Sequence, residues 1–264
     1  MKLHDLTGRI ALVTGGGAGI GLATARLLGQ HGARVAVTDI RAPELDAAIA
    51  GLRAEGIDAT GYVSDVTDEA AVDTLVDRVQ SELGLITILI NNAGSGSHTL
   101  PEQVTMAEFR HMFELNLAGS FMMARAVGRR LMAAGQGGTI VNVSSLAATS
   151  ALGRGNISFS VSKAGVNQMT RELAVEWAGA GIRVNAVQPC QVDTPGFSLL
   201  ANSPGGKALL ERMIRGIPLG RLATSEDCAA AIHFLASDAA AMITGVILPV
   251  DGGNLALNAG GTSR

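Results

Sequence analysis

Three glycines stand at a spacing that suits a phosphate-binding turn. Gly15, Gly19 and Gly21 form a G-x-x-x-G-x-G pattern directly after a short apolar run at 10–14 and before a helical pattern. Such glycines permit a tight turn out of a strand, let a pyrophosphate approach the backbone, and let the helix pack closely on the sheet. The N–H groups at the helix N-terminus then face anionic oxygens. We expect a dinucleotide cofactor to be held by Gly15, Gly17, Gly19, Ile20 and Gly21.

An acidic residue ends the second predicted strand. Asp39 lies 18 positions after Gly21, where a carboxylate accepts hydrogen bonds from ribose hydroxyls and repels a 2′-phosphate. Arg41 would partly offset that repulsion, but Gly17 adds no basic side chain to the loop. The sequence therefore predicts NAD as the cofactor, with Asp39 and Ile40 at the ribose. The alternative is that Asp39 is an ordinary acid at the end of a strand.

Short apolar runs alternate with longer helical patterns along the chain. The runs predict strands at 10–14, 34–38, 59–63, 87–90, 139–143, 183–187 and 246–250. The helical patterns occupy 19–31, 43–55, 68–82, 102–134, 157–179 and 225–237. Most runs lack the alternation of a half-exposed sheet, which indicates strands buried on both faces. The order predicts a single-domain, Rossmann-like, doubly wound α/β fold with a seven-stranded parallel sheet flanked by helices.

One segment, at about 194–223, interrupts this rhythm. It contains three prolines and an adjacent pair of glycines around a short helical stretch at about 207–215. Two interpretations stay open: a mobile segment on the substrate side of a pocket, or an ordered surface excursion. No linker composition divides the chain, so we expect one domain over residues 1–264.

Composition argues against several classes of protein. A net charge of −3 without a long basic cluster gives no sign of a nucleic-acid partner. No apolar run is long enough for a transmembrane helix and no signal peptide is visible, so we expect a cytoplasmic protein without membrane contact. Two cysteines without a CxxC pair, and five histidines without ligand spacing, predict neither a disulfide framework nor a metal site.

Further polar and glycine motifs follow the later strands in a fixed order. They are Asp65-Val66, Asn91-Asn92-Ala93-Gly94, Asn116, Ser144-Ser145, Lys163, Pro189, Thr194 and Asp251-Gly252-Gly253. This order, over essentially the whole chain, resembles the short-chain dehydrogenase/reductase family. The family usually assembles as dimers or tetramers, so the resemblance implies a homotetramer, with a homodimer as the alternative.

The resemblance also implies roles for single positions. Adenine would lie at Asp65 and Val66, the carboxamide at Thr194, and Pro189 would shape the pocket of the nicotinamide ring. The implied cofactor contacts after the second strand are Asp65, Val66, Asn92, Ala93, Gly94, Lys163, Pro189, Val192 and Thr194. The implied catalytic positions are Asn116, Ser145, Phe159 and Lys163. Ser145 would bind the substrate oxygen, and Lys163 would bind the nicotinamide ribose. Asn116 would maintain an irregularity in its helix and would hold a water.

The chain departs from the family at the catalytic tyrosine. The family motif is Tyr-x-x-x-Lys, whereas this chain reads Phe159-Ser160-Val161-Ser162-Lys163. The spacing puts Phe159 and Lys163 on one helix face. Phe159 has no hydroxyl to protonate an alkoxide, and losing a general acid costs roughly 10²–10⁴ in rate. The family's activity would therefore be impaired or altered in this chain.

Three explanations of Phe159 stay open. The first is a Tyr→Phe exchange in an otherwise active dehydrogenase. The second is a natural phenylalanine with another proton donor: Ser145, Ser158, Ser160, His98, or a water held by Asn116 and Lys163. The third is a protein that does not need this proton, because it reduces a protonated imine or only binds NAD(H).

The expected substrate pocket is polar. We place Ser95, Ser145, Asn156, Cys190 and Gln191 in it. Cys190 replaces the glycine that more often follows Pro189 in the family, and a small buried thiol is favoured over a nucleophile. The spacing between Ser145 and Phe159 is one residue longer than is usual in the family. Ser144 therefore stays open as an alternative serine for binding the substrate.

The activity we expect is an NAD(H)-dependent interconversion of a secondary alcohol and a ketone on a small molecule. The polar residues of the pocket segments favour a hydroxylated substrate, such as a sugar or polyol. They are Ser95, Ser97, His98, Thr149, Arg154, Asn156 and Gln191. A non-catalytic NAD(H)-binding protein is the alternative.

Overall fold

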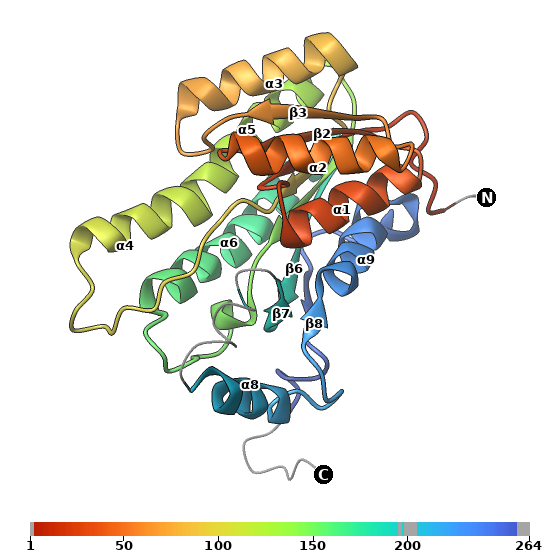
Figure 1. Cartoon of the computed structure of the whole chain (residues 1–264). Coiled ribbons are helices and arrows are strands. Elements are labelled where there is room, and N and C mark those ends of the chain that lie inside the picture. Colours follow the sequence, from red (N-terminus) through yellow and green to blue (C-terminus); the bar gives the residue numbers. More distant parts are fainter. Residues whose placement is uncertain (1–2, 195–196, 198–204, 258–264) are drawn as a thin grey trace.

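Seven strands form a parallel sheet in the order β3-β2-β1-β4-β5-β6-β9. Figure 1 labels β2, β3 and β6 of this sheet. They are β1 (Ile10–Thr14), β2 (Arg34–Asp39), β3 (Ala59–Val63), β4 (Ile88–Asn91), β5 (Gly138–Val143), β6 (Ile182–Pro189) and β9 (Ile247–Val250). The computed structural model describes residues 3–194, 197 and 205–257. The strand order reverses between β1 and β4, and such a switch point is where open α/β sheets bind ligands. The predicted doubly wound fold is confirmed.

Helices cover both faces of the sheet. They are α1 (Gly19–Gln30), α2 (Ala42–Ala54), α3 (Glu69–Leu83), α4 (Met106–Phe113), α5 (Gly119–Ala133), α6 (Ile157–Glu176), α8 (Gly206–Arg215) and α9 (Ser225–Ala236). Buried side chains of α1, α2 and α9 share one core cluster with the strands. Those of α3, α5 and α6 belong to a second cluster. Every residue of β1 and β4 is buried, which explains why these runs do not alternate.

The helix N-termini differ in whether a side chain satisfies their free N–H groups. Asp68 caps α3 by accepting hydrogen bonds from the N–H groups of Ala70 and Ala71. Thr224 caps α9 in a capping box with Asp227. In contrast, Ala18 at the start of α1 offers no side-chain cap, and the first turn of α1 holds no acid, as is also the case for α6 and α8. The first N–H groups of α1 are therefore available to an anion.

The helix expected at 102–134 is divided. Thr105 caps α4 by accepting a hydrogen bond from Glu108 N–H, so the helix begins at Met106. A π-helical turn η1 (Glu114–Ala118) then joins α4 to α5. A single helix over 102–134 was therefore wrong, because apolar periodicity alone does not reveal a cap or a π-turn. The irregularity itself, expected at Asn116 from the resemblance, is present.

A two-stranded sheet lies beside the interrupted segment and had not been predicted. It pairs β7 (Val192–Asp193) with β8 (Ala223–Thr224). Strands of two residues leave no hydrophobic pattern to read. The helix expected at about 207–215 is confirmed as α8. Residues 195–196 and 198–204 lie outside the described residues, so a mobile segment at about 194–223 stays a prediction.

The described residues contain neither a membrane-spanning helix nor a cluster of metal ligands. No helix in that part of the chain is long and apolar enough to cross a membrane. No group of three or more His, Cys, Asp or Glu within it could hold a metal. Cys190 and Cys228 are free thiols, both buried.

Three histidines pack together where the N-terminal segment meets α1 and α9. The ring of His233 lies 4.0 Å from that of His31 and 5.5 Å from that of His4, centroid to centroid. His233 Nε2 lies 3.0 Å from the backbone oxygen of His4. Burial lowers the pKa of His233 below its usual 6.5. The folded chain therefore resists protonation that the unfolded chain accepts.

This cluster predicts a loss of stability in mild acid. The stabilising contribution is fully present above about pH 6.5, and it is lost as the pH falls from there toward the lower pKa of folded His233. Urea unfolding between neutral and mildly acidic pH should show the free energy of unfolding decrease. His233→Phe should flatten this dependence, whereas His111→Gln, at an exposed histidine, should not. An equal slope for His233→Phe and the unchanged chain would contradict the assignment.

Candidate functional site

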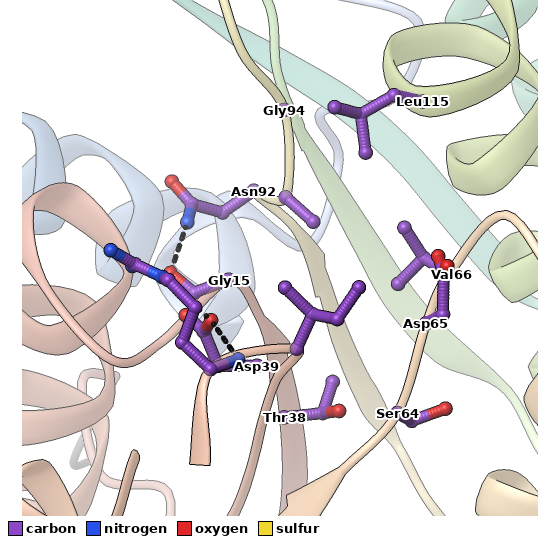
Figure 2. Close-up of a pocket in the computed structure, with 12 residues that line it drawn as sticks. Gly15, Thr38, Asp39, Ser64, Asp65, Val66, Asn92, Gly94 and Leu115 are labelled. Atoms are coloured by element: carbon purple, nitrogen blue, oxygen red, sulfur yellow. Dashed lines mark hydrogen bonds and ion pairs between the residues drawn. The ribbon is translucent and has the colours of Figure 1, made fainter. Parts of the chain in front are cut away.

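A cavity of about 340 Å³ lies at the carboxyl ends of β1, β2, β3 and β4. Figure 2 shows the labelled residues arranged around it. Its lining residues are Gly15, Thr38, Asp39, Ile40, Arg41, Ser64, Asp65, Val66, Asn92, Ala93, Gly94 and Leu115. Eight of them are residues that the sequence proposed for the cofactor, and they come from four separate strand ends.

The glycine turn has the backbone that the pattern predicted. Gly15 and Gly19 have φ values of +62° and +56°, a region that favours glycine. A Cβ added at Gly21 would lie 2.4 Å from the backbone oxygen of Gly15. Gly21 therefore permits the close contact between α1 and the turn. The turn is also tied to β4, since Asn92 Nδ2 donates to the oxygen of Thr14 at 3.0 Å. It also donates to the oxygen of Gly15 at 2.9 Å (Figure 2).

Asp39 is a buried carboxylate held by its neighbours. Only 6% of the residue is exposed. Its Oδ2 accepts a hydrogen bond from Gly17 N–H at 3.0 Å, and its Oδ1 accepts from Arg41 N–H at 3.1 Å and Arg41 Nε at 3.3 Å. Burial raises the pKa of Asp39, but the bonds from Arg41 and Gly17 outweigh it and bring the pKa below 3.8. Asp39 is therefore ionised at neutral pH.

Gly17 does not line the cavity but makes room for this carboxylate. A Cβ at Gly17 would lie 2.9 Å from Asp39 Oδ2. A side chain there would displace the carboxylate or its hydrogen bond. Position 17 therefore requires a glycine because of Asp39, and Gly17 itself does not line the cavity.

The far side of this cavity combines expected and missed residues. Asp65 Oδ1 accepts hydrogen bonds from Thr67 N–H at 2.8 Å and Thr67 Oγ1 at 2.7 Å. Thr38 Oγ1 and Ser64 Oγ are buried without a partner among the described residues. Sequence reasoning did not single out Thr38, Ser64 or Leu115. The available signal was their place at or just after strands, or, for Leu115, beside Asn116.

A second cavity, of about 620 Å³, lies beside the carboxyl end of β6. Its lining includes nine residues that the sequence proposed: Ile20, Ser145, Asn156, Phe159, Pro189, Cys190, Gln191, Val192 and Thr194. Ser144, His98 and Arg154 also line it. Gly19 lies against Thr194, since a Cβ at Gly19 would be 3.5 Å from Thr194 Cγ2. The glycine turn and this cavity are therefore neighbours.

Lys163 and Asn116 lie next to Gly94, outside the lining of both cavities. A Cβ at Gly94 would be 2.5 Å from Asn116 Oδ1 and 3.4 Å from Lys163 Nζ. Lys163 Nζ donates to the oxygen of Val143 at 2.7 Å, and burial lowers its pKa to about 8. Lys163 is thus not a solvated helix lysine, and Asn116, which is fully buried, does not face solvent.

Asn116 joins the turn after β4 to α6. Its Nδ2 donates to the oxygen of Ser95 and to Ser162 Oγ, both at 3.1 Å, and its Oδ1 accepts from Ser95 N–H. Ser95, expected in the substrate pocket, lines neither cavity and instead belongs to this network. Asn91 donates to Asn142 Oδ1 at 2.9 Å and so ties β4 to β5.

The two candidate serines differ in their hydrogen bonds. Ser144 Oγ donates to Asn167 Oδ1 at 2.6 Å and is buried. Ser145 Oγ accepts from Ala147 N–H at 3.2 Å, and its own proton has no acceptor in the described part of the chain. Ser145 is therefore the better placed donor to a substrate oxygen. Cys190 is buried, and burial raises its pKa, which argues against a thiolate nucleophile.

Comparison with known proteins agrees with this geometry. A family model described as enoyl-(acyl carrier protein) reductase matches residues 15–254. D-threitol dehydrogenase of Mycolicibacterium smegmatis is 42% identical, over 94% of this chain and 93% of its own length. The chain belongs to the short-chain dehydrogenase/reductase family. A second relative, cis-4-hydroxycyclohexanecarboxylate dehydrogenase of Sinomonas cyclohexanicum, is 44% identical, over 94% of this chain and 97% of its own length.

Solved structures of the family superpose closely on this chain. The crystal structure of gox2181 has a TM-score of 0.93 and 36% identity, over 97% of this chain and 99% of that one. A gluconate 5-dehydrogenase from Burkholderia cenocepacia, in complex with NADP and tartrate, has a TM-score of 0.90 and 30% identity over the same shares. The shared fold therefore includes the carboxyl ends of the strands, where both cavities lie.

Proposed function

We propose that this short-chain dehydrogenase/reductase binds NAD(H) and interconverts a secondary alcohol and the matching ketone. The observation that carries the proposal is the ionised, buried Asp39 in the same cavity as the glycine turn. A fixed carboxylate there accepts hydrogen bonds from ribose hydroxyls and repels a 2′-phosphate. The related gluconate 5-dehydrogenase was solved with NADP, so the shared fold does not by itself favour NAD, and the proposal of NAD rests on Asp39.

The described residues fit a nicotinamide dinucleotide. The uncapped N-terminus of α1 suits the pyrophosphate, Asp39 the adenosine ribose, and Asp65 with Val66 the adenine. The unpartnered hydroxyls of Thr38 and Ser64 add two polar groups to that cavity. Thr194 and Pro189 would hold the nicotinamide end in the second cavity. When bound, the nicotinamide supplies hydride chemistry, and the protein supplies position and proton flow.

Gly21→Ala is expected to weaken NADH binding by about tenfold or more, because the added methyl group would push α1 away from Gly15. Gly51→Ala is a matched control in helix α2, since its Cβ would have no neighbour within 4 Å. Titration of the NADH fluorescence gives the dissociation constants of both variants. Equal affinity in the two would contradict the assigned role of the turn.

At the reacting carbon, Ser145 would donate a hydrogen bond to the substrate oxygen. Lys163, which lies beside Gly94, would hold the nicotinamide ribose. Phe159 lines the same cavity as Ser145 but cannot move a proton. We therefore expect turnover to be impaired in this chain, or to rely on another donor such as Ser145 or His98.

Phe159 also favours a second candidate function. A protein that only binds NAD(H), or that reduces an already protonated imine, needs no proton from position 159. The two candidates share the cofactor site and differ only in turnover. They separate when the unchanged chain is assayed for both properties.

The substrate class rests on the second cavity and the relatives. One relative is named for a polyol and one for a hydroxy acid. Asn156, Gln191 and Arg154 contribute polar groups to the lining of this cavity. We infer a hydroxylated small molecule as the substrate.

We also propose a homotetramer, with a homodimer as the alternative. Five large apolar side chains of α5 and α6 are exposed: Phe121, Met132, Ile157, Val161 and Val175. Exposed apolar residues on two helices that cover the same core cluster favour burial against another copy.

The proposed activity is tested by mixing the unchanged chain and its Phe159→Tyr variant with NAD and a panel of secondary alcohols. Formation of NADH by the variant with at least one alcohol supports a dehydrogenase site. Binding of NADH without turnover by either chain supports the second candidate. Absence of both binding and turnover would overturn the proposal.

A further inference from the structure

The second cavity contains an arginine that forms no ion pair with any of the described residues. Arg154 is the only Arg, Lys, Asp or Glu among the described residues that line it. Its Nε is buried and has no hydrogen-bond partner in the described part of the chain. No ion pair joins Arg154 to a described carboxylate.

Arg154 is half-buried as a residue. This burial lowers the pKa of Arg154 below its usual value, yet a guanidinium keeps its proton in proteins. Buried charges are normally paired and hydrogen-bonded, because transfer from water is unfavourable. An unpaired cation beside a cavity therefore indicates a place for an anionic ligand.

The turn that carries Arg154 is fixed in place. Gly155 has φ +75°, and its Cβ position lies 2.6 Å from the backbone oxygen of His98. Asn156 Nδ2 donates to the backbone oxygen of Ser97 at 3.0 Å. These contacts hold the turn against residues 97–99. Because the turn is already ordered, less conformational entropy is lost when a ligand binds.

The same cavity offers unused acceptors. Asn156 Oδ1 and Gln191 Oε1 are buried and have no donor among the described residues. Both residues line the cavity. Acceptors of this kind complement hydroxyl groups, whereas the guanidinium complements an anion.

We propose that Arg154 binds a carboxylate of the substrate, so that this chain acts on a hydroxy acid in preference to a neutral polyol. The inference rests on the proposed function, since it assigns the substrate class of that site. A single guanidinium matches the single charge of a carboxylate, and its planar fork can bind both oxygens. A phosphate ester carries nearly two charges and would bring an excess of negative charge to a cavity with one described cation.

The test compares matched ligands by calorimetry on the NAD-loaded protein. One pair is gluconate and glucitol, and a second is cis-4-hydroxycyclohexanecarboxylate and 4-(hydroxymethyl)cyclohexanol. In at least one pair the acid should bind about 10- to 100-fold more tightly than its neutral partner. Arg154→Gln should remove this difference, while Arg129→Gln, at an exposed arginine on α5, should preserve it.

Three results would overturn the role of Arg154. They are equal binding of acid and neutral partner in both pairs, a preference for the acid that survives in Arg154→Gln, and no binding of any acid. Tighter binding of glycerol phosphate than of glycerate would also overturn the carboxylate assignment. The proposed function is judged separately on the same samples, from NADH titration and from turnover by the Phe159→Tyr variant. Arg154→Gln should leave the NADH dissociation constant unchanged, which shows that the variant is folded.

Discussion

Replacing Phe159 with tyrosine is expected to raise the turnover number by about 10²- to 10⁴-fold, the usual contribution of a positioned general acid or base. Phe159 lines the second cavity together with Ser145. A phenol at this place can protonate the alkoxide formed in ketone reduction, or accept the proton released in alcohol oxidation. Tyrosine keeps the ring shape, so the exchange adds a hydroxyl with little change in packing.

Lys163 should make that phenol effective. It lies one helical turn after Phe159, on the same face of α6. Burial lowers its pKa to about 8, so its amine still carries a proton at neutral pH. A nearby cation stabilises a phenolate and lowers its pKa toward the working range. The gain from Phe159→Tyr should therefore be lost when Lys163→Met is added.

The gain is measured as the rate of NADH formation with saturating NAD and an alcohol panel. Phe109→Tyr is the control, because it adds the same hydroxyl on α4, outside the lining of both cavities. High activity in the unchanged chain that does not increase in the variant would show that another group supplies the proton. NADH binding without a gain would favour the binding protein.

Asp39→Asn is expected to reduce the preference for NAD over NADP by about 100-fold, because two effects add. The variant loses charge-assisted hydrogen bonds to the ribose hydroxyls, and it no longer repels a 2′-phosphate. Arg41, now bonded to the carboxylate at 3.3 Å, would then be shared between that phosphate and Glu44, which it already contacts at 3.4 Å.

The preference is the ratio of the NADPH and NADH dissociation constants, from fluorescence titration. Asp58→Asn is the matched control, since it removes an exposed carboxylate that pairs with Arg34 at the start of β2. Arg41→Gln in the Asp39→Asn background should reverse most of the gain in NADPH affinity. An unchanged ratio in Asp39→Asn would show that Asp39 does not discriminate between a ribose 2′-hydroxyl and a 2′-phosphate.

The fold was largely predictable because its strands are buried on both faces. Strands covered by helices on both faces are continuous apolar runs, such as the one at 10–14. Such runs are recognisable from the sequence alone. The π-turn at Asn116 was different, since apolar periodicity continues across it. Only the family resemblance placed an irregularity there.

The site was predictable in its strand-end residues and not in its unsatisfied groups. Asp39 and the glycines follow from the geometry of a strand-to-helix turn. In contrast, the burial of Lys163 and the unpaired state of Arg154 depend on segments far apart in the chain. The position of Ser95 also depends on a distant segment, because Ser95 is hydrogen-bonded to Asn116 and lines neither cavity. Sequence spacing does not contain such contacts.

The central claim, that Asp39 and the glycine turn bind NAD(H), is tested most directly by titrating the unchanged chain with NADH and NADPH. Calorimetry reports both dissociation constants without requiring turnover. We expect saturable binding of NADH that is at least about tenfold tighter than that of NADPH. Binding of neither cofactor, or tighter binding of NADPH, would contradict the account.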